Sequence, residues 1–272
     1  MGASLPASLT LALTLLSGAG RARAQSDLVT VFAAASLTEA FNELGRRFER
    51  EHPGTRVRFN YAGSQQLVLQ LQQGAEADAF ASADERWMRT AQEDGLLAGA
   101  PTLFARNRLV VIVPAGNPAR VSALPDLARP GLKIVLAAEA VPAGLYTRQA
   151  LDKFAGAAGF PADYAARVLA NVVSEEDNVK AVVTKVELGE ADAGFVYRSD
   201  VRPGVARAIK VLEISDRYNV IAAYPIALVR GSKHIAVARR FVELVLGDSG
   251  QVVLERHGLT RRSASETAAG RP

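Results

Sequence analysis

The stretch Val31–Phe41 reads VFAAASLTEAF and joins two different hydrophobic patterns. The apolar run that begins at Val31 ends in three alanines, which is typical of a buried strand. Ser36 then opens a helical pattern with Glu39 three residues later, which fits a capping box with Ser36 as the N-cap. The sequence therefore predicts a strand that runs directly into a helix. The small side chains at the junction would let another group come close to the backbone.

The alternation of strand and helix patterns continues along the chain. Strands are expected at 28–34, 57–61, 77–84, 109–113, within 133–144, and at 193–197, 220–223 and 224–229. Helices are expected at 37–49, 65–73, 87–94, 145–154, 178–188, 234–246 and 250–256. Pro225 interrupts the last strand, which indicates a position at an edge or a hinge. This alternation predicts an α/β fold with mostly parallel sheets, in which ligands bind beyond the carboxyl ends of the strands.

Composition narrows the class of protein. The chain has 272 residues, of which 49% are hydrophobic and 22% are charged, so it is globular and long enough for two lobes. The formal net charge of +4 is small and spread along the chain, and no nucleic-acid partner is expected. The absence of cysteine excludes disulfides, thiolate metal sites and a lipid-modified N-terminal cysteine. No later segment is apolar enough to be membrane-embedded.

The two ends of the chain are expected to lie outside the fold. Leu9–Ser17 is an apolar run too short to span a bilayer, and Ala22-Arg23-Ala24 follows as a cleavage pattern. We therefore expect 1–24 to be a signal peptide that is cut after Ala24, with the mature protein in the periplasm; the alternative is an N-terminal core helix. The polar segment 261–272 is expected to be a disordered tail.

Five residues stand where predicted strands end and helices begin: Ser36, Ser64, Ala143, Val179 and Tyr197. Each has an ordinary explanation by itself: N-caps for the two serines, a proline-glycine turn for Ala143, a core position beside a cap for Val179, and a half-buried ring for Tyr197. Taken together, the five positions indicate a binding site for an anion. Helix starts that follow parallel strands leave free N–H groups aimed at one crevice, and such a crevice favours an anion.

The sequence at these positions resembles the periplasmic molybdate-binding proteins of ABC importers, a family with the type II periplasmic-binding-protein fold. The motifs that carry the resemblance span about 28–259 in the family's order: VFAAASLTEAF, AGSQQL, GAEADAFASADERWM, VPAGLY, DNVKAVV and GFVYRSD. It implies two α/β lobes with an oxyanion in the cleft between them. Ser36 and Ser64 would supply hydroxyls and amides, Ala143 and Val179 backbone amides, and Tyr197 its phenolic hydroxyl.

The resemblance also implies how the chain is divided and what it works with. Lobe one is expected to contain 27–107 and 224–260, and lobe two 108–223. The expected ligand is molybdate or tungstate, with no cofactor, no direct cation ligands and no catalytic residues. The expected partner is the membrane permease of an ABC importer, and the protein is expected to be a monomer. Two departures from the family pattern bear on selectivity: Gln65 and Gln66 follow the second serine, and Ala137–Ala140 replaces a segment that commonly holds Asp-Pro.

A site made only of neutral donors suits molybdate, a tetrahedral dianion without protons. A carboxylate on the pocket wall would repel this ligand, and the proton of a protonated phosphate would find no acceptor. The acidic run Glu175–Asp177 lies close to the predicted site in sequence, and we expect it to cap its helix from the solvent side.

Three other functions compete with this interpretation. A sulfate carrier would use the same donors, because sulfate has the same charge and shape. A hydrolase would need a nucleophile and a base, but the sequence has no G-x-S-x-G elbow and its three histidines lie outside the small-residue turns. A ferric-iron carrier would need clustered Tyr, His and carboxylates, whereas Tyr197 and Tyr224 are separated in sequence with no histidine near either.

Overall fold

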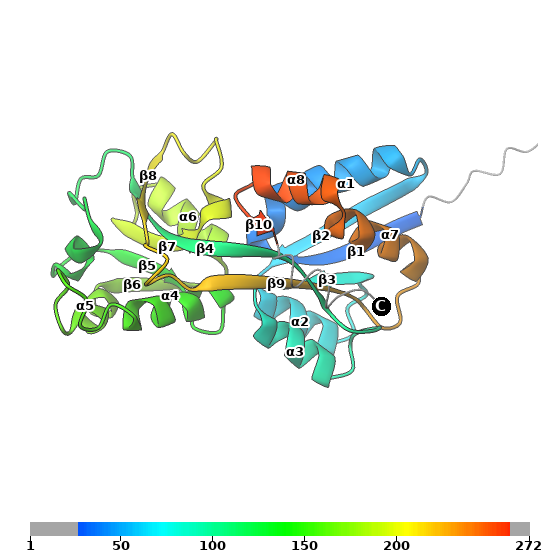
Figure 1. Cartoon of the computed structure of the whole chain (residues 1–272), viewed down its shortest axis with the longest axis horizontal. Helices are drawn as coiled ribbons and strands as arrows, with labels where there is room; N and C mark the ends of the chain where they lie inside the picture. The colour runs from blue at the N-terminus through cyan, green and yellow to red at the C-terminus, as the bar shows by residue number, and fades with distance from the viewer. Residues whose placement is uncertain (1–26, 262–272) are drawn as a thin grey trace, which may run out of the picture.

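The computed structural model describes residues 27–261, which fold into two α/β lobes side by side (Figure 1). The predicted signal peptide, 1–24, lies outside the described residues, as does the predicted tail from 262 onward. Arg261 belongs to a short strand, β10 (Thr260–Arg261), so the first residue of the range predicted as a tail is part of the sheet. Among residues 27–261, no helix is both long and apolar enough to cross a membrane.

Lobe one is built around β1 (Asp27–Ala34), whose last six residues are buried. β1 pairs in parallel with β2 (Thr55–Ala62) on one side and with β3 (Ala79–Ala81) on the other. The helices of this lobe are α1 (Thr38–Glu51), α2 (Ser64–Gln72), α3 (Glu85–Glu93), α7 (Ile235–Leu246) and α8 (Asp248–Arg256). The apolar stripe of α1 at Ala40, Phe41, Leu44 and Phe48 is buried against the sheet, which confirms the helical pattern predicted there.

Lobe two repeats the arrangement around β5 (Ile134–Ala137). β5 pairs in parallel with β6 (Val172–Glu176) and with β7 (Ala193–Tyr197). The helices α4 (Pro142–Asp152), α5 (Tyr164–Ala170) and α6 (Val179–Glu187) belong to this lobe, as does the strand β8 (Ile209–Glu213). Across both lobes, residues 27–261 also contain three short 3-10 helices, at Ala35–Leu37, Leu124–Ala128 and Arg198–Asp200.

Two long antiparallel strands join the lobes: β4 (Thr102–Pro114) and β9 (Ile221–Leu228) (Figure 1). Residues 102–108 of β4 pair with β9, and residues 109–114 pair with β7 and β8. The strand order β2-β1-β3-β9-β4-β7-β5-β6 therefore passes through both lobes. Both strands contain the segments where the sequence predicts a crossing, and the exact division at 107/108 and 223/224 stays a prediction.

The expectation that Pro225 marks an edge strand or a hinge is wrong in its first part. The two strands predicted at 220–223 and 224–229 form the single strand β9, which has β3 on one side and β4 on the other. The register of β4 shifts between Leu103 and Ala105, beside Pro225. This bulge accommodates the missing N–H, and the Pro225 carbonyl still accepts a hydrogen bond from the Ser82 N–H at 3.0 Å.

Candidate functional site

All five predicted site residues line one small cavity between the lobes. The other lining residues are Ala35, Gly63, Ala83, Val141, Pro142 and Asn178. The cavity measures about 10 Å³, counted as the space open to the centre of a water molecule. It therefore suits a compact ligand, and a sugar or a peptide would not fit.

The carboxyl ends of parallel strands bring these residues together from both lobes. Ser36 follows β1 in a 3-10 turn, and Ser64 is the first residue of α2, after β2. Ala143 and Val179 lie in the first turns of α4 and α6, which follow β5 and β6, and Tyr197 ends β7. The predicted convergence of strand ends and helix starts is present in the structure.

The predicted capping role of Ser36 is wrong. The 3-10 turn Ala35–Leu37 precedes α1, so the helix starts at Thr38 and has no side-chain cap. The Ser36 hydroxyl instead lies 2.9 Å from the hydroxyl of Tyr224 in β9. The carboxylate of Glu39, predicted to complete the capping box, forms ion pairs with side chains outside its helix.

Ser64 is also not an N-cap, because Gly63 occupies that position. The Ser64 hydroxyl is buried and accepts a hydrogen bond from the Ala83 backbone N–H at 3.0 Å. Neither serine therefore uses its hydroxyl on its own helix. Both hydroxyls reach the cavity wall with their positions fixed by a neighbouring element.

The helix starts of lobe two contribute backbone groups. Asn178 caps α6 by accepting a hydrogen bond from the Ala181 N–H at 3.2 Å, which leaves Val179 as the first helical residue. Ala143 follows Pro142, which occupies the first position of α4. Amides in a first helical turn have no acceptor within the helix, so those of Ala143 and Val179 are available to a ligand.

The Tyr197 hydroxyl is the most informative atom of the site. It is buried and has no hydrogen-bond partner within residues 27–261. Such a hydroxyl is costly to bury unless a ligand pairs with it. Burial raises the pKa of Tyr197 well above its ordinary value, so the phenol keeps its proton and can donate it to an acceptor in the cavity.

The cavity lining contains no charged residue. The acidic run that precedes α6 does not cap this helix, so that expectation is wrong. Glu175 forms an ion pair with Arg148, and Glu176 forms one with Lys185 at 2.6 Å. These basic partners hold the two carboxylates away from the cavity wall.

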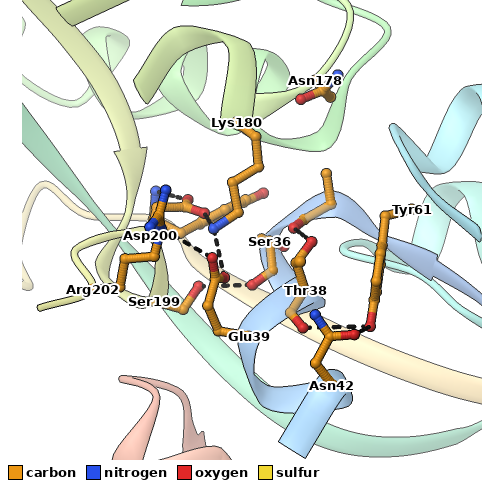
Figure 2. Close-up of polar contacts among 12 residues, drawn as sticks. Ser36, Thr38, Glu39, Asn42, Tyr61, Asn178, Lys180, Ser199, Asp200 and Arg202 are labelled. Carbon is orange, nitrogen blue, oxygen red and sulfur yellow. Dashed lines mark hydrogen bonds and ion pairs between the residues drawn. The ribbon is translucent and has the colours of Figure 1, made fainter. Parts of the chain in front are cut away.

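A cluster of alternating charges crosses the cleft beside the cavity (Figure 2). The Lys180 ammonium on α6 lies 2.6 Å from a Glu39 carboxylate oxygen on α1 and 3.2 Å from one of Asp200. Arg202 Nε contacts the other Glu39 oxygen at 3.0 Å. Burial alone would lower the pKa of Lys180, but the charges of Asp200 and Glu39 outweigh it and raise the pKa. The four formal charges cancel, so the cluster joins the lobes without adding net charge.

Sequence reasoning missed this cluster, because Glu39 and Lys180 are 141 positions apart and no local pattern links them. A second group of contacts joins the lobes elsewhere along the cleft. Gln65 Nε2 donates to the Asp177 carbonyl at 2.9 Å, and Trp87 Nε1 donates to the Ala140 carbonyl at 2.8 Å. Contacts of both groups close the lobes onto the cavity.

Tyr197 and Tyr224, separated in sequence, are neighbours in space. Their ring centroids lie 5.9 Å apart in an edge-to-face arrangement. Burial also raises the pKa of Tyr224, as it does that of Tyr197, so both phenols are protonated at neutral pH. Within residues 27–261, no group of three or more His, Asp or Glu side chains is placed to hold a metal ion.

Comparison with known proteins places this architecture in a family. Residues 29–260 match the family described as bacterial extracellular solute-binding protein. The chain belongs to this family. The family is one of solute carriers rather than enzymes, as the sequence predicts.

Three known proteins are similar to this chain, one in sequence and two in fold. The molybdate-binding protein ModA of Mycobacterium tuberculosis is 40% identical over 233 residues, which cover 86% of this solute-binding protein and 84% of ModA. The periplasmic molybdate-binding protein of Azotobacter vinelandii has a TM-score of 0.74 at 20% identity, over 86% of this chain and 100% of the other. The sulfate-binding protein SubI of M. tuberculosis has a TM-score of 0.77 at 16% identity, over 89% and 90%. The two structural matches confirm the predicted two-lobed fold.

Proposed function

We propose that this solute-binding protein captures molybdate, and also tungstate, and delivers it to the membrane permease of an ABC importer. One observation carries the proposal. Five residues from five segments of both lobes line one small cavity that offers hydroxyls and amides and has no charged side chain on its wall. The 40% identity to a protein named as molybdate-binding supports the same ligand.

The donors of the cavity match a tetrahedral dianion. The hydroxyls of Ser36, Ser64 and Tyr197 and the amides of Ala143 and Val179 come from five segments of the two lobes and would share the four ligand oxygens. Each helix start adds a partial positive charge of roughly half a unit. An affinity in the nanomolar to micromolar range needs about 8 to 12 kcal/mol. Hydrogen bonds to a charged ligand contribute roughly 1.5–3 kcal/mol each, so five or more reach this range.

A titration of the mature protein with molybdate, tungstate, sulfate and phosphate tests the proposal. A ligand present at about a hundred times its dissociation constant adds about 2.7 kcal/mol to the free energy of unfolding, which thermal shift detects readily. We expect strong stabilisation by molybdate and tungstate and little by the other two anions. No response to any of the four would overturn the proposal.

A sulfate carrier is the second candidate, because the fold is similar to that of a sulfate-binding protein. Sulfate carries the same charge as molybdate but is smaller, so its oxygens would leave some donors of a rigid cavity stretched. Calorimetry separates the two, because equal stabilisation by sulfate and molybdate would favour the sulfate carrier.

We further propose that the protein acts as a periplasmic monomer after cleavage behind Ala24. Membership of an extracellular solute-binding family supports export. Sequencing the N-terminus of the exported protein tests the cleavage position, and light scattering tests the oligomeric state. A first residue far from position 25, or a stable dimer, would contradict these two proposals.

A further inference from the structure

The buried amide of Asn107 in β4 has a fixed orientation. Its Oδ1 accepts a hydrogen bond from the Arg108 backbone N–H at 3.0 Å. Its Nδ2 donates to the Ser199 hydroxyl at 2.8 Å and to the Tyr224 hydroxyl at 3.3 Å. Because Asn107 is buried and both of its polar atoms are occupied, it acts toward the site only as a donor.

The Tyr224 hydroxyl links Asn107 to Ser36, so the donor orientation of Asn107 sets the direction of the hydrogen bond between Tyr224 and Ser36. Its oxygen accepts from Asn107, and the only other described contact that could take its proton is Ser36 Oγ at 2.9 Å. In the opposite arrangement Ser36 would donate to Tyr224, and the phenolic proton would be buried without a partner. Buried donors are nearly always paired, so Tyr224 donates to Ser36.

Ser36 consequently accepts one hydrogen bond from the protein and keeps its own proton for the cavity. Ser64 is in the same situation, because its oxygen accepts from the Ala83 N–H at 3.0 Å. Both serines line the cavity. Each therefore faces the ligand as a donor, with an oxygen lone pair already engaged by the protein.

We propose that Asn107 and Tyr224 are positioning residues that fix the direction of the Ser36 hydrogen bond and thereby discriminate against oxyanions that carry a proton. The inference rests on the proposed function, since it takes the cavity to hold an oxyanion. Molybdate offers only acceptors to this set of donors. Hydrogen phosphate has the same charge, but its proton needs an acceptor that the serines do not offer, and an unpaired buried donor is costly.

Calorimetry with Tyr224→Phe tests the inference. Dissociation constants are measured for molybdate, and for hydrogen phosphate as its competitor, at mildly alkaline pH where both are dianions. The substitution removes the proton donor of Ser36 and frees a lone pair for the ligand. We expect molybdate to bind about tenfold more weakly. The dissociation constant of hydrogen phosphate divided by that of molybdate should fall by about tenfold. An unchanged ratio in the folded variant would overturn the inference.

Tyr164→Phe is the matched control. Its hydroxyl donates to the Leu124 carbonyl at 2.6 Å within lobe two and does not line the cavity. This variant loses a hydrogen-bonded phenolic hydroxyl of the same kind, so its stability falls while the ratio of dissociation constants stays that of the wild type. A narrowed ratio in Tyr164→Phe would show that the Tyr224 effect is only structural and would overturn the inference.

Asn107→Asp is a second variant, with a side chain of the same shape in which a carboxylate oxygen, an acceptor, replaces the amide nitrogen, a donor. The new carboxylate accepts the Tyr224 proton, so Ser36 donates to Tyr224 and presents a lone pair to the cavity. The added charge repels both dianions alike, and the ratio of their dissociation constants should still narrow. Wild-type protein is titrated in parallel: failure of the wild type to bind molybdate would refute the proposed function. Normal wild-type binding with unchanged ratios in both variants would refute only this inference.

Discussion

At the scale of single residues, the site depends on which hydroxyl protons the protein leaves unused. Ser36 and Ser64 each accept one hydrogen bond from the protein, and the Tyr197 hydroxyl has no partner within residues 27–261. Removing a serine hydroxyl would leave the buried group that donates to it unpaired, so both ligand binding and folding would suffer. Tyr197 differs, because its hydroxyl contributes nothing to the fold without the ligand.

Tyr197→Phe should therefore separate binding from folding. We expect an unchanged or slightly raised melting temperature without ligand, because the change removes an unpaired buried polar group. Molybdate affinity should fall by about tenfold to a hundredfold, the equivalent of one charge-assisted hydrogen bond. Thermal shift and calorimetry with and without molybdate check both parts. A lower melting temperature in the absence of ligand would contradict this account.

The pH dependence of binding follows from the same residues. Burial raises the pKa of Tyr197 and Tyr224 above the ordinary tyrosine value of 10.0. The pKa of Lys180 is raised above the ordinary value of 10.5, because Asp200 and Glu39 outweigh the opposing effect of burial. A raised pKa keeps each group protonated to higher pH, so the phenols still donate and the cluster stays charged as pH rises.

We therefore expect molybdate affinity to stay flat from neutral pH to about pH 10, the pH at which an unperturbed tyrosine is half ionised. Calorimetry across this range, in buffers of constant ionic strength, provides the measurement. A steep loss of affinity below the ordinary tyrosine pKa would mean that a phenol of the site ionises early.

At the scale of secondary-structure elements, the start of α2 is fitted closely to the opposite lobe. A Cβ added to Gly63 would lie 2.6 Å from the Asp177 carbonyl oxygen and about as close to the Gln65 side chain. The Gln65 side chain can move aside, but the carbonyl is backbone. Only glycine at this position lets the lobes approach as they do here.

Gly63→Ala should therefore hold the lobes apart and weaken molybdate binding by about tenfold while each lobe folds normally. Gly116→Ala is the matched control, since a Cβ at Gly116 meets no atom within 4 Å. Calorimetry and circular dichroism of the two variants provide the comparison. Wild-type affinity in Gly63→Ala would show that α2 does not limit closure.

At the scale of the whole molecule, closure depends on contacts that join the lobes on both sides of the cavity. Lys180 on α6 holds Glu39 on α1 (Figure 2). Trp87 on α3 donates to the Ala140 carbonyl at 2.8 Å. Trp87 is the one tryptophan of the chain, so its fluorescence reports on the separation of the lobes.

Lys180→Gln should shift the ligand-free protein toward an open arrangement, because Glu39 and Asp200 then lack their ammonium partner and gain by hydration. We expect a larger radius of gyration in X-ray scattering, a red-shifted Trp87 emission, and recovery of both on adding molybdate. Lys185→Gln is the control, since Lys185 pairs with Glu176 inside lobe two. An identical response of the two variants would argue against the cross-lobe role.

The sequence by itself determined the α/β class, most helices and buried strands, and the five residues around the cavity. The class and the elements follow from hydrophobic periodicity, which is a local property. The five residues follow from their places at the junctions of strands and helices together with the resemblance to a known family. Local signals also fail where burial is partial. β6 alternates between half-buried and exposed positions, β8 has only Ile209 buried, and neither strand was predicted. The start of α4 at Pro142, three residues before the predicted helix, was obscured by the proline and glycine of the turn motif.

Only the tertiary structure decided what the polar side chains of the site do. Ser36 looks like an N-cap in sequence, yet its partner is Tyr224, 188 positions away. Glu39 looks like part of the same cap, yet its partners are Lys180 and Arg202 in the other half of the chain. Hydrophobic burial depends on periodicity that nearby residues encode. A hydrogen bond depends on distance and direction between two atoms, and the packing of β9 and α6 against the end of β1 sets both.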